Sequence, residues 1–191
     1  MNETSEFENL SGKLLIAMPD MGDPRFSNSV VYLCDHSTSG SMGVIINKVA
    51  TDVTMGELLE QLSINTGQFD TEAPVHFGGP VETNRGFVLH TSDYFRKGIT
   101  LRVDEVANMT ASLEVLQDAA EGDGPREFLM ALGYAGWGEG QLEDEISQNG
   151  WLTCDPTHDI LFSDDNAGKW TAALKQLGVN PLMLSSTAGH A

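Results

Sequence analysis

The residues from His76 to Pro80 read His-Phe-Gly-Gly-Pro, and Arg85 follows after a short polar stretch. Adjacent glycines let backbone amides approach a ligand and adopt positive φ angles, and such amides can form a nest for an anion. Arg85 would add a positive charge to that nest. The stretch lacks the Lys-Ser/Thr pair of a phosphate-binding loop and the spacing of a dinucleotide fingerprint. Two interpretations therefore stay open, a ligand-binding loop and a bend between two strands.

Under the first interpretation the bend borders the main surface cleft. The residues expected to line that ligand site are Asn47, His76, Gly78, Gly79, Arg85 and His90. Under either interpretation, Gly78 or Gly79 is predicted to have a positive φ, where a Cβ would cost about 1–2 kcal/mol. Because successive strand residues alternate, Phe77 is predicted to point inward and His76 to the opposite face.

Thiol and imidazole groups offer a second kind of chemistry. Cys34 and His36 lie two positions apart on a predicted strand, which would place them on the same side, and a Cys–His pair can act as an activated thiol. A small packed cysteine beside a histidine at the strand end is the alternative. Zinc needs three or four converging ligands, and no His-x-x-x-His or Cys-x-x-Cys spacing connects His36, His76 and His90. We expect neither a metal site nor a cofactor.

A second polar surface is suggested near the end of the chain. Trp137, Gln141, Glu145 and Asn149 are spaced by four, which places them along one helical face if a helix begins near Trp137. Together with Trp151, this set could contact a small polar ligand or a peptide. The alternative is that the tryptophans anchor the helix to the core and the polar groups cap loops.

The charge balance argues against nucleic acid as a partner. The chain has 28 acidic and 10 basic residues and a net charge of −18. Non-specific affinity for DNA comes mostly from lysine and arginine side chains that neutralise phosphates. We therefore expect no direct binding to duplex DNA.

The sequence carries no signal for a membrane or for export. No apolar run approaches the roughly 20 residues that span a bilayer, and the acidic N-terminus lacks the basic and apolar regions of a secretory signal. The two cysteines, Cys34 and Cys154, are too few for a disulfide framework. We expect a cytoplasmic protein whose two thiols are packed and unbridged.

Short apolar runs predict strands, and apolar residues at helical spacing predict helices. Thr54 and Glu57 fit a capping box at the start of a helix, and Asp155-Pro156 suits the N-cap and first residue of another. The strands are expected at 13–18, 30–36, 42–47, 75–77, 86–90, 127–134, 151–154 and 181–184. The helices are expected at 55–62, 109–120, 141–148, 156–161 and 167–177.

The order of these elements is mixed and does not alternate regularly between strand and helix. It favours an α+β protein, a compact mixed fold with a central twisted, largely antiparallel sheet and flanking helices. The length suits a single domain over residues 12–191, preceded by a flexible N-terminal segment over residues 1–11.

Several segments, in the same order, resemble the YqgE/AlgH family over nearly the whole chain. These segments are residues 12–19, 23–24, 29–36, 42–47, 77–81, 85–90, 133–137, 140–143 and 184–191. The resemblance implies a largely uncharacterised bacterial family with a compact mixed fold. It also implies an association with transcriptional regulation, specifically of alginate synthesis in one member lineage. It supplies no catalytic residue, cofactor or metal to carry over.

Two functions remain in competition. The first is a non-catalytic regulatory or binding protein that takes a small molecule or a protein partner around the Gly-Gly-Pro bend and acts on transcription indirectly. The second is an enzyme, a hydrolase or transferase, that uses His36, His76 or His90 with Cys34. Convergence of these side chains in one pocket would favour the enzyme.

Overall fold

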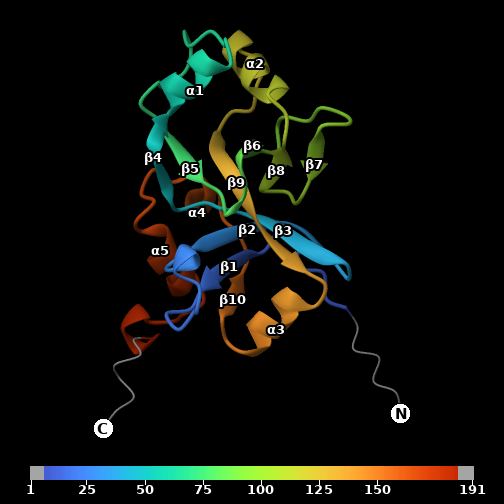
Figure 1. Ribbon diagram of the computed structural model, residues 1–191, viewed down its shortest axis with the longest axis vertical. Coiled ribbons are helices and arrows are strands. Elements are labelled where there is room, and N and C mark those ends of the chain that lie inside the picture. Colours follow the sequence, from blue (N-terminus) through green and yellow to red (C-terminus); the bar gives the residue numbers. More distant parts are fainter. Residues whose placement is uncertain (1–6, 185–191) are drawn as a thin grey trace.

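A curled, largely antiparallel sheet runs through the molecule and carries helices on its flanks, which confirms the predicted α+β fold (Figure 1). The computed structural model describes residues 7–184. Most of the predicted flexible segment 1–11 and the tail beyond Leu184 lie outside this range. The strands are β1 (Leu14–Ala17), β2 (Val30–Ser37), β3 (Gly40–Ile45), β4 (Val49–Thr54), β5 (Pro74–Phe77), β6 (Val81–Thr91), β7 (Thr100–Arg102), β8 (Ala107–Thr110), β9 (Phe128–Gly138) and β10 (Trp151–Cys154).

The helices are short and fill the connections between the strands. The α-helices are α1 (Met55–Gln61), α2 (Glu114–Glu121), α3 (Gln141–Ser147), α4 (His158–Phe162) and α5 (Lys169–Gln176), and the 3-10 helices are η1 (Pro24–Phe26) and η2 (Pro181–Leu184). The predicted capping box of α1 is confirmed, since Thr54 Oγ1 accepts from the Glu57 amide at 3.2 Å and Glu57 Oε2 accepts from the Thr54 amide at 2.9 Å. Two of the four free amides at this helix start are thereby satisfied.

Strand β9 is the central member of the sheet. The strand order is β10-β1-β2-β3-β9-β6-β8-β7, with β5 joined to β4 and to β9. Only the β5–β9 pairing is parallel among the described pairs. One end of β9 pairs with β5 and β6 while the other end pairs with β3, so β9 links the two halves of the molecule (Figure 1).

The core lies on both faces of the sheet, which explains why β1 and β2 read as continuous apolar runs. Alternate residues of β1 serve different clusters. Leu14 and Ile16 pack toward α4 and α5, whereas Leu15 and Ala17 pack toward α3 and the two buried tryptophans. A third cluster lies under α1 and α2, at the far end of β9.

Two predicted helix starts and the type of one predicted element were wrong. Thr157, and not Asp155, caps α4, because its side chain accepts from the Ile160 amide. Met109 lies in β8 and not in the helix that follows, and that helix, α2, ends at its C-cap Gly122. The final apolar run at Pro181 forms a 3-10 helix and not a strand.

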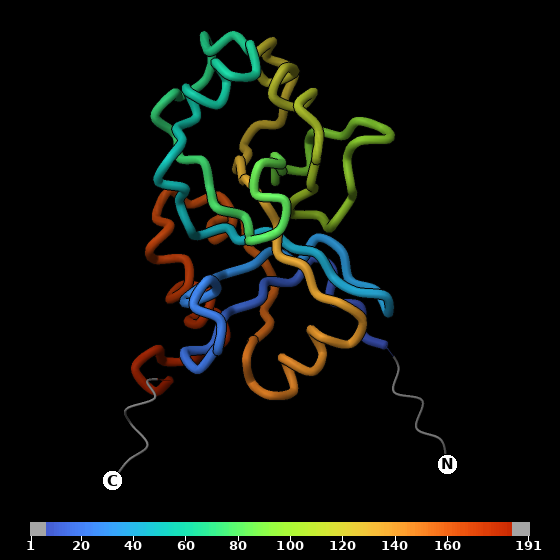
Figure 2. Tube along the Cα trace, in the orientation of Figure 1, coloured from blue at the N-terminus to red at the C-terminus, as the bar shows by residue number. Residues whose placement is uncertain are grey.

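The Gly-Gly-Pro stretch carries the chain across β9. Strand β5 pairs with one edge of β9 and β6 with the other, and the green segment between them crosses the orange strand in Figure 2. Gly79 has φ = 153°, as predicted for one of the two glycines. A Cβ on Gly79 would lie 2.0 Å from the carbonyl carbon of Tyr134. The glycines therefore allow two backbones to cross in contact.

Candidate functional site

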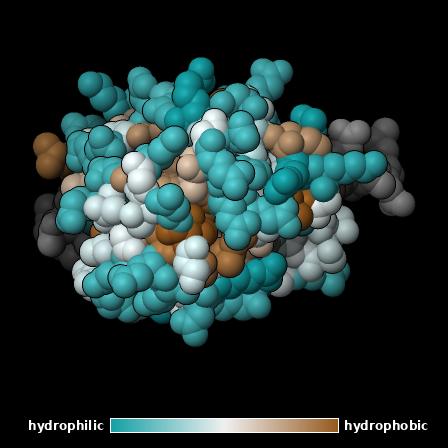
Figure 3. All heavy atoms as spheres, turned by 90° about the horizontal axis from the view of Figure 1, so that it is seen from above, coloured by the Kyte–Doolittle hydropathy of each residue, from teal (hydrophilic) through white to brown (hydrophobic). Residues whose placement is uncertain are grey.

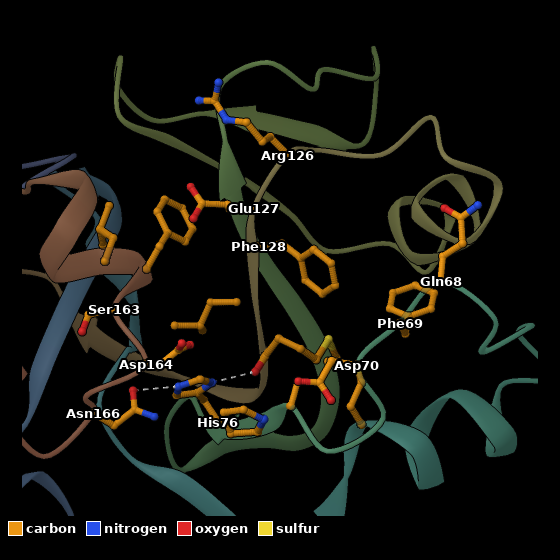
Figure 4. Close-up of a pocket in the computed structure, with 17 residues that line it drawn as sticks. Gln68, Phe69, Asp70, His76, Arg126, Glu127, Phe128, Ser163, Asp164 and Asn166 are labelled. Atoms are coloured by element: carbon orange, nitrogen blue, oxygen red, sulfur yellow. Dashed lines mark hydrogen bonds between the residues drawn. The ribbon is translucent and has the colours of Figure 1, made fainter.

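A cavity of about 300 Å³ opens beside the glycine crossing, and His76 lies at its floor (Figure 4). His76 and Phe77 are on opposite faces of β5, as predicted, because Phe77 packs toward the α3 side. The cavity is bounded by the segment before β5, the start of β9 and the loop between α4 and α5. Its lining residues are Met55, Gln68, Phe69, Asp70, Ala73, Pro74, His76, Arg126, Glu127, Phe128, Leu129, Met130, Leu161, Phe162, Ser163, Asp164 and Asn166.

Both ring nitrogens of His76 have partners. Nδ1 lies 3.2 Å from the carbonyl oxygen of Met130, and Nε2 lies 3.0 Å from Oδ1 of Asn166. Burial, assisted by the nearby charge of Lys169, lowers the pKa of His76 below the ordinary histidine value. A neutral ring donates only once. It is satisfied when Nδ1 donates to Met130 and the Asn166 amide presents its NH₂ group to Nε2, whereas a protonated ring donates to both oxygens.

The substitution Asn166→Asp should therefore raise the pKa of His76. A carboxylate facing Nε2 stabilises the imidazolium form by charge and by hydrogen bonding. An NMR titration of the histidine ring protons measures this directly. Asn166→Ala is the matched control and should leave the pKa of His76 below that of the aspartate variant. Equal pKa values in the two variants would contradict the contact.

The candidate Cys–His pair does not form, and the alternative of a packed cysteine holds. A bulge between Leu33 and Asp35 inserts Cys34 as an extra residue in β2, so the alternation of side chains is broken there. Cys34 turns into the core toward α5, while His36 turns toward α3, where Nε2 contacts Glu143 at 2.7 Å. The expectation that Cys34 and His36 face the same side was wrong.

Both thiols are unbridged and buried, as predicted. Burial is the main cause that raises the pKa of the Cys34 thiol far above the ordinary value and that of Cys154 to about 11. The thiolate is the nucleophile in cysteine chemistry, so neither thiol is activated at neutral pH.

The three candidate histidines contact different partners. His36 accepts from the Leu10 amide at 2.9 Å, and His90 contacts the Thr91 carbonyl and the Thr110 hydroxyl at 2.9 and 2.8 Å. Neither lines the His76 cavity. Among residues 7–184, no group of three metal-binding side chains is arranged to hold a metal ion.

The remaining residues of the predicted ligand site also separate. Asn47 uses both ends of its amide to hold the turn before β2, accepting from the Val30 amide at 2.9 Å and donating to the Asn28 carbonyl at 2.8 Å. Gly78 donates to Leu132 and accepts from Ile45, both at 2.8 Å. The backbone of Gly78 is therefore engaged by its neighbours and does not provide a free amide.

Arg85 borders a different, open groove near the β2–β3 hairpin. Its guanidinium contacts Glu82 at 3.3 Å and lies 5.2 Å from the centre of the Phe87 ring. The groove encloses about 640 Å³ and includes Ser37, Ser39 and Ser41. Of the six residues predicted around the bend, only His76 lines the cavity described above.

The second predicted surface assembles in part, by a different route. Trp137 belongs to β9, and α3 begins only at Gln141, so the predicted continuous helix was wrong. Even so, Glu145 Oε2 accepts from the indole N–H of Trp137 at 2.8 Å and from that of Trp151 at 2.9 Å. Its other oxygen accepts from the Gln141 amide at 3.2 Å. Asn149 has φ = 60° and lies in the turn after α3.

Glu145 should contribute to stability through these two indole groups. Glu145→Leu removes the acceptor from both, which should lower the free energy of unfolding by about 2 kcal/mol. Glu145→Gln keeps an accepting oxygen and should cost less. Urea unfolding measures both variants, with exposed Glu139→Leu as the control. Equal losses in the leucine and glutamine variants would show that the indole contacts contribute little.

The residues opposite His76 could not be identified directly from the sequence. Asp164 and Asn166 belong to the run Ser163-Asp-Asp-Asn166. Asn166 lies 90 positions after His76 in the chain. The local signal is a polar run between two apolar helices, which predicts a loop. It does not specify which strand that loop meets.

The chain belongs to the AlgH-like family, whose sequence model matches residues 14–182. A UPF0301 protein of Cereibacter sphaeroides is 51% identical over 183 residues, which cover 96% of this chain and 100% of that protein. A UPF0301 protein of Ruegeria pomeroyi is 54% identical over 184 residues, with the same coverage. The resemblance seen in the ordered sequence segments is therefore confirmed.

Solved structures agree with this assignment. The solution structure of the AlgH protein from Pseudomonas aeruginosa is 42% identical and matches with a TM-score of 0.77 over 100% of both chains. A crystal structure of a protein from Corynebacterium diphtheriae matches with a TM-score of 0.75 over 91% of both chains. At 18% identity, the latter likeness concerns the fold alone. Between residues 7 and 184, no helix has the length and apolar character needed to span a membrane.

Proposed function

We propose that this protein is a non-catalytic binding protein that holds a small molecule in the His76 cavity. The observation that carries the proposal is the cavity itself, which combines apolar walls with a few polar groups that converge on His76 (Figure 4). Ligand pockets in proteins have this composition and typically enclose about 300–1,000 Å³. Any effect on transcription is indirect, through a change in the protein's partners when the ligand binds.

The contacts of His76 support binding without catalysis. A general base needs a ring nitrogen within reach of the proton it removes, and both nitrogens of His76 already have protein partners. The Ser163 hydroxyl oxygen in the same lining accepts from the Asp165 amide. The polar groups are thus suited to orient a ligand.

The negative charge of the chain supports an indirect regulatory effect, without binding to duplex DNA. A net charge of −18 repels the phosphates of duplex DNA, so a regulatory effect would pass through a ligand or a protein partner. A cytoplasmic location is part of the same proposal, and the two unbridged thiols of Cys34 and Cys154 support it. Seen from above, the molecule presents a mostly hydrophilic surface with apolar atoms gathered near its centre (Figure 3).

A thermal-shift screen that compares the native protein with a variant whose cavity is filled by a larger side chain tests this function. Binding to the native state alone raises stability by mass action, about 2.7 kcal/mol at a hundredfold excess over Kd. Metabolites that raise the melting temperature of the native protein should fail to do so in Ala73→Phe, which fills the cavity. Ala111→Phe places the same ring in the groove beside Arg85 and should leave the response intact.

The proposal is wrong if hits from the library stabilise Ala73→Phe as much as the native protein, or if none stabilises the native protein. Ala73→Leu replaces the larger variant if Ala73→Phe does not unfold cooperatively. Circular dichroism establishes that each variant is folded before the comparison is made.

A further inference from the structure

We infer that the ligand of the His76 cavity is a small amine, with a protonated amino group on an aromatic or branched apolar body. This inference rests on the proposed binding function and specifies the class of ligand. It follows from two features of the same cavity, an apolar interior and a rim of carboxylates.

The interior accepts an apolar body. The rings of Phe69 and Phe128 lie edge to face with their centres 6.0 Å apart (Figure 4), and Phe162 of α4 also lines the cavity. The aliphatic lining comes from Met55, Leu129, Met130 and Leu161. A ring or branched chain placed here removes apolar surface from water, which is worth about 25 cal/mol per Å².

The rim favours a positive charge. Asp70, Glu127 and Asp164 contribute carboxylates to the lining, and in Figure 4 Asp70 and Asp164 lie on either side of His76. Arg126 is the one permanently charged base in the lining, and its side chain points away from His76 in the same view. The lining therefore has three acids against one base whose charge is directed elsewhere.

Two of these carboxylates retain accepting capacity. Asp70 Oδ1 accepts from the Glu72 amide, which leaves its other oxygen available. The Asp164 carboxylate accepts no hydrogen bond from any residue between 7 and 184, whereas Glu127 already contacts His158. Because Asp70 and Asp164 are exposed at the rim, an ammonium group beside them keeps part of its hydration, and its desolvation cost is small.

The same arrangement disfavours anions. An anionic group near His76 would face the two aspartates, and His76 gives no compensating charge because burial lowers its pKa. The buried Lys169 ammonium is nearby, but it donates to the carbonyls of Ile46 and Leu161 and does not line the cavity. The ring faces of the phenylalanines add a modest attraction for a cation. Charge and shape therefore select an amine over an alcohol of the same size, and an alcohol over a carboxylate.

NMR titration with three matched probes tests the inference. Phenethylamine, 2-phenylethanol and 3-phenylpropanoate share a phenyl body and differ mainly in charge. Amide signals of the cavity residues should shift with the amine at about tenfold lower concentration than with the alcohol, and the carboxylate should bind most weakly. Added salt should weaken amine binding and leave alcohol binding nearly unchanged.

Charge-neutralising variants complete the test. Asp164→Asn should weaken amine binding several-fold and leave alcohol binding unchanged. Asp52→Asn, an exposed carboxylate outside the cavity lining, is the matched control. If the alcohol or the carboxylate binds the cavity as tightly as the amine, the ligand class is wrong and the binding function stands. If none of the probes shifts the cavity signals, the amine inference is wrong, and the library screen with Ala73→Phe decides the binding function separately.

Discussion

Replacing Gly79 with alanine should destabilise the protein by more than about 4 kcal/mol, a loss found only for severe defects. The added Cβ would lie 2.0 Å from the carbonyl carbon of Tyr134 and 2.4 Å from the amide nitrogen of Ala135. Both are backbone atoms of the central strand, so no side-chain rotation can relieve the overlap. Since native domains are stable by only about 5–15 kcal/mol, urea unfolding of this variant should begin at far lower concentrations.

Two other glycines separate the causes of that loss. Gly98 has φ = 88° with open space around its added Cβ, so Gly98→Ala should cost only about 1–2 kcal/mol of backbone strain. Gly22 has open space and no positive φ, so Gly22→Ala should change stability little. A Gly79→Ala loss no larger than that of Gly98→Ala would contradict the crossing of two backbones in contact.

Lys169 should impose a distinctive pH dependence on stability. Its ammonium group is buried and donates to the carbonyl oxygens of Ile46 and Leu161 at 2.9 and 3.1 Å. Burial lowers its pKa from 10.5 to about 8. Below pH 8 both the folded and unfolded chains carry this charge, and only the folded chain bears the cost of burying it. Between about pH 8 and 10.5 the folded chain releases the proton first, so this group's contribution to stability rises with pH.

A difference between two variants isolates the contribution of Lys169, because other groups titrate in the same pH range. The free energy of unfolding of the native protein minus that of Lys169→Met should increase by about 3 kcal/mol from pH 7 to pH 10.5. Burial of Cys34 and Cys154 raises their thiol pKa values and acts in the opposite direction, but this contribution is shared and cancels. Lys175→Met, on the exposed side of the same helix, is the control for the loss of one lysine. A difference that does not change with pH would contradict the buried charge.

Local signals in the sequence were enough to predict much of the fold. The capping box at Thr54, the strands β2 and β3, and the positive φ at Gly79 depend on residues close together in the chain. The bulge at Cys34 was not predictable in this way, because nothing in the apolar run of β2 distinguishes a regular strand from a bulged one. That single extra residue turned His36 away from Cys34 and removed the basis of the proposed thiol chemistry.

The candidate site was predicted only at one point. His76 lies beside the glycine crossing, as its place in the sequence suggested, but the groups that face it come from distant segments. Asn166 reaches Nε2 from a loop that tertiary packing brings to β5, and Phe128 arrives from the start of β9. Conversely, Trp137 and Glu145 are in contact, as their spacing suggested, but not along one helix. Trp137 lies in β9 and Glu145 in α3, so the helical spacing between them is a coincidence.

The central claim is that the cavity at His76, and not the more open groove at Arg85, is the ligand site. A crystal structure of the native protein with the tightest compound from the thermal-shift screen tests it most directly. We expect electron density between His76 and Phe128, with the polar end of the compound at Asp70 or Asp164. Density in the groove beside Arg85, with the His76 cavity unfilled, would contradict it.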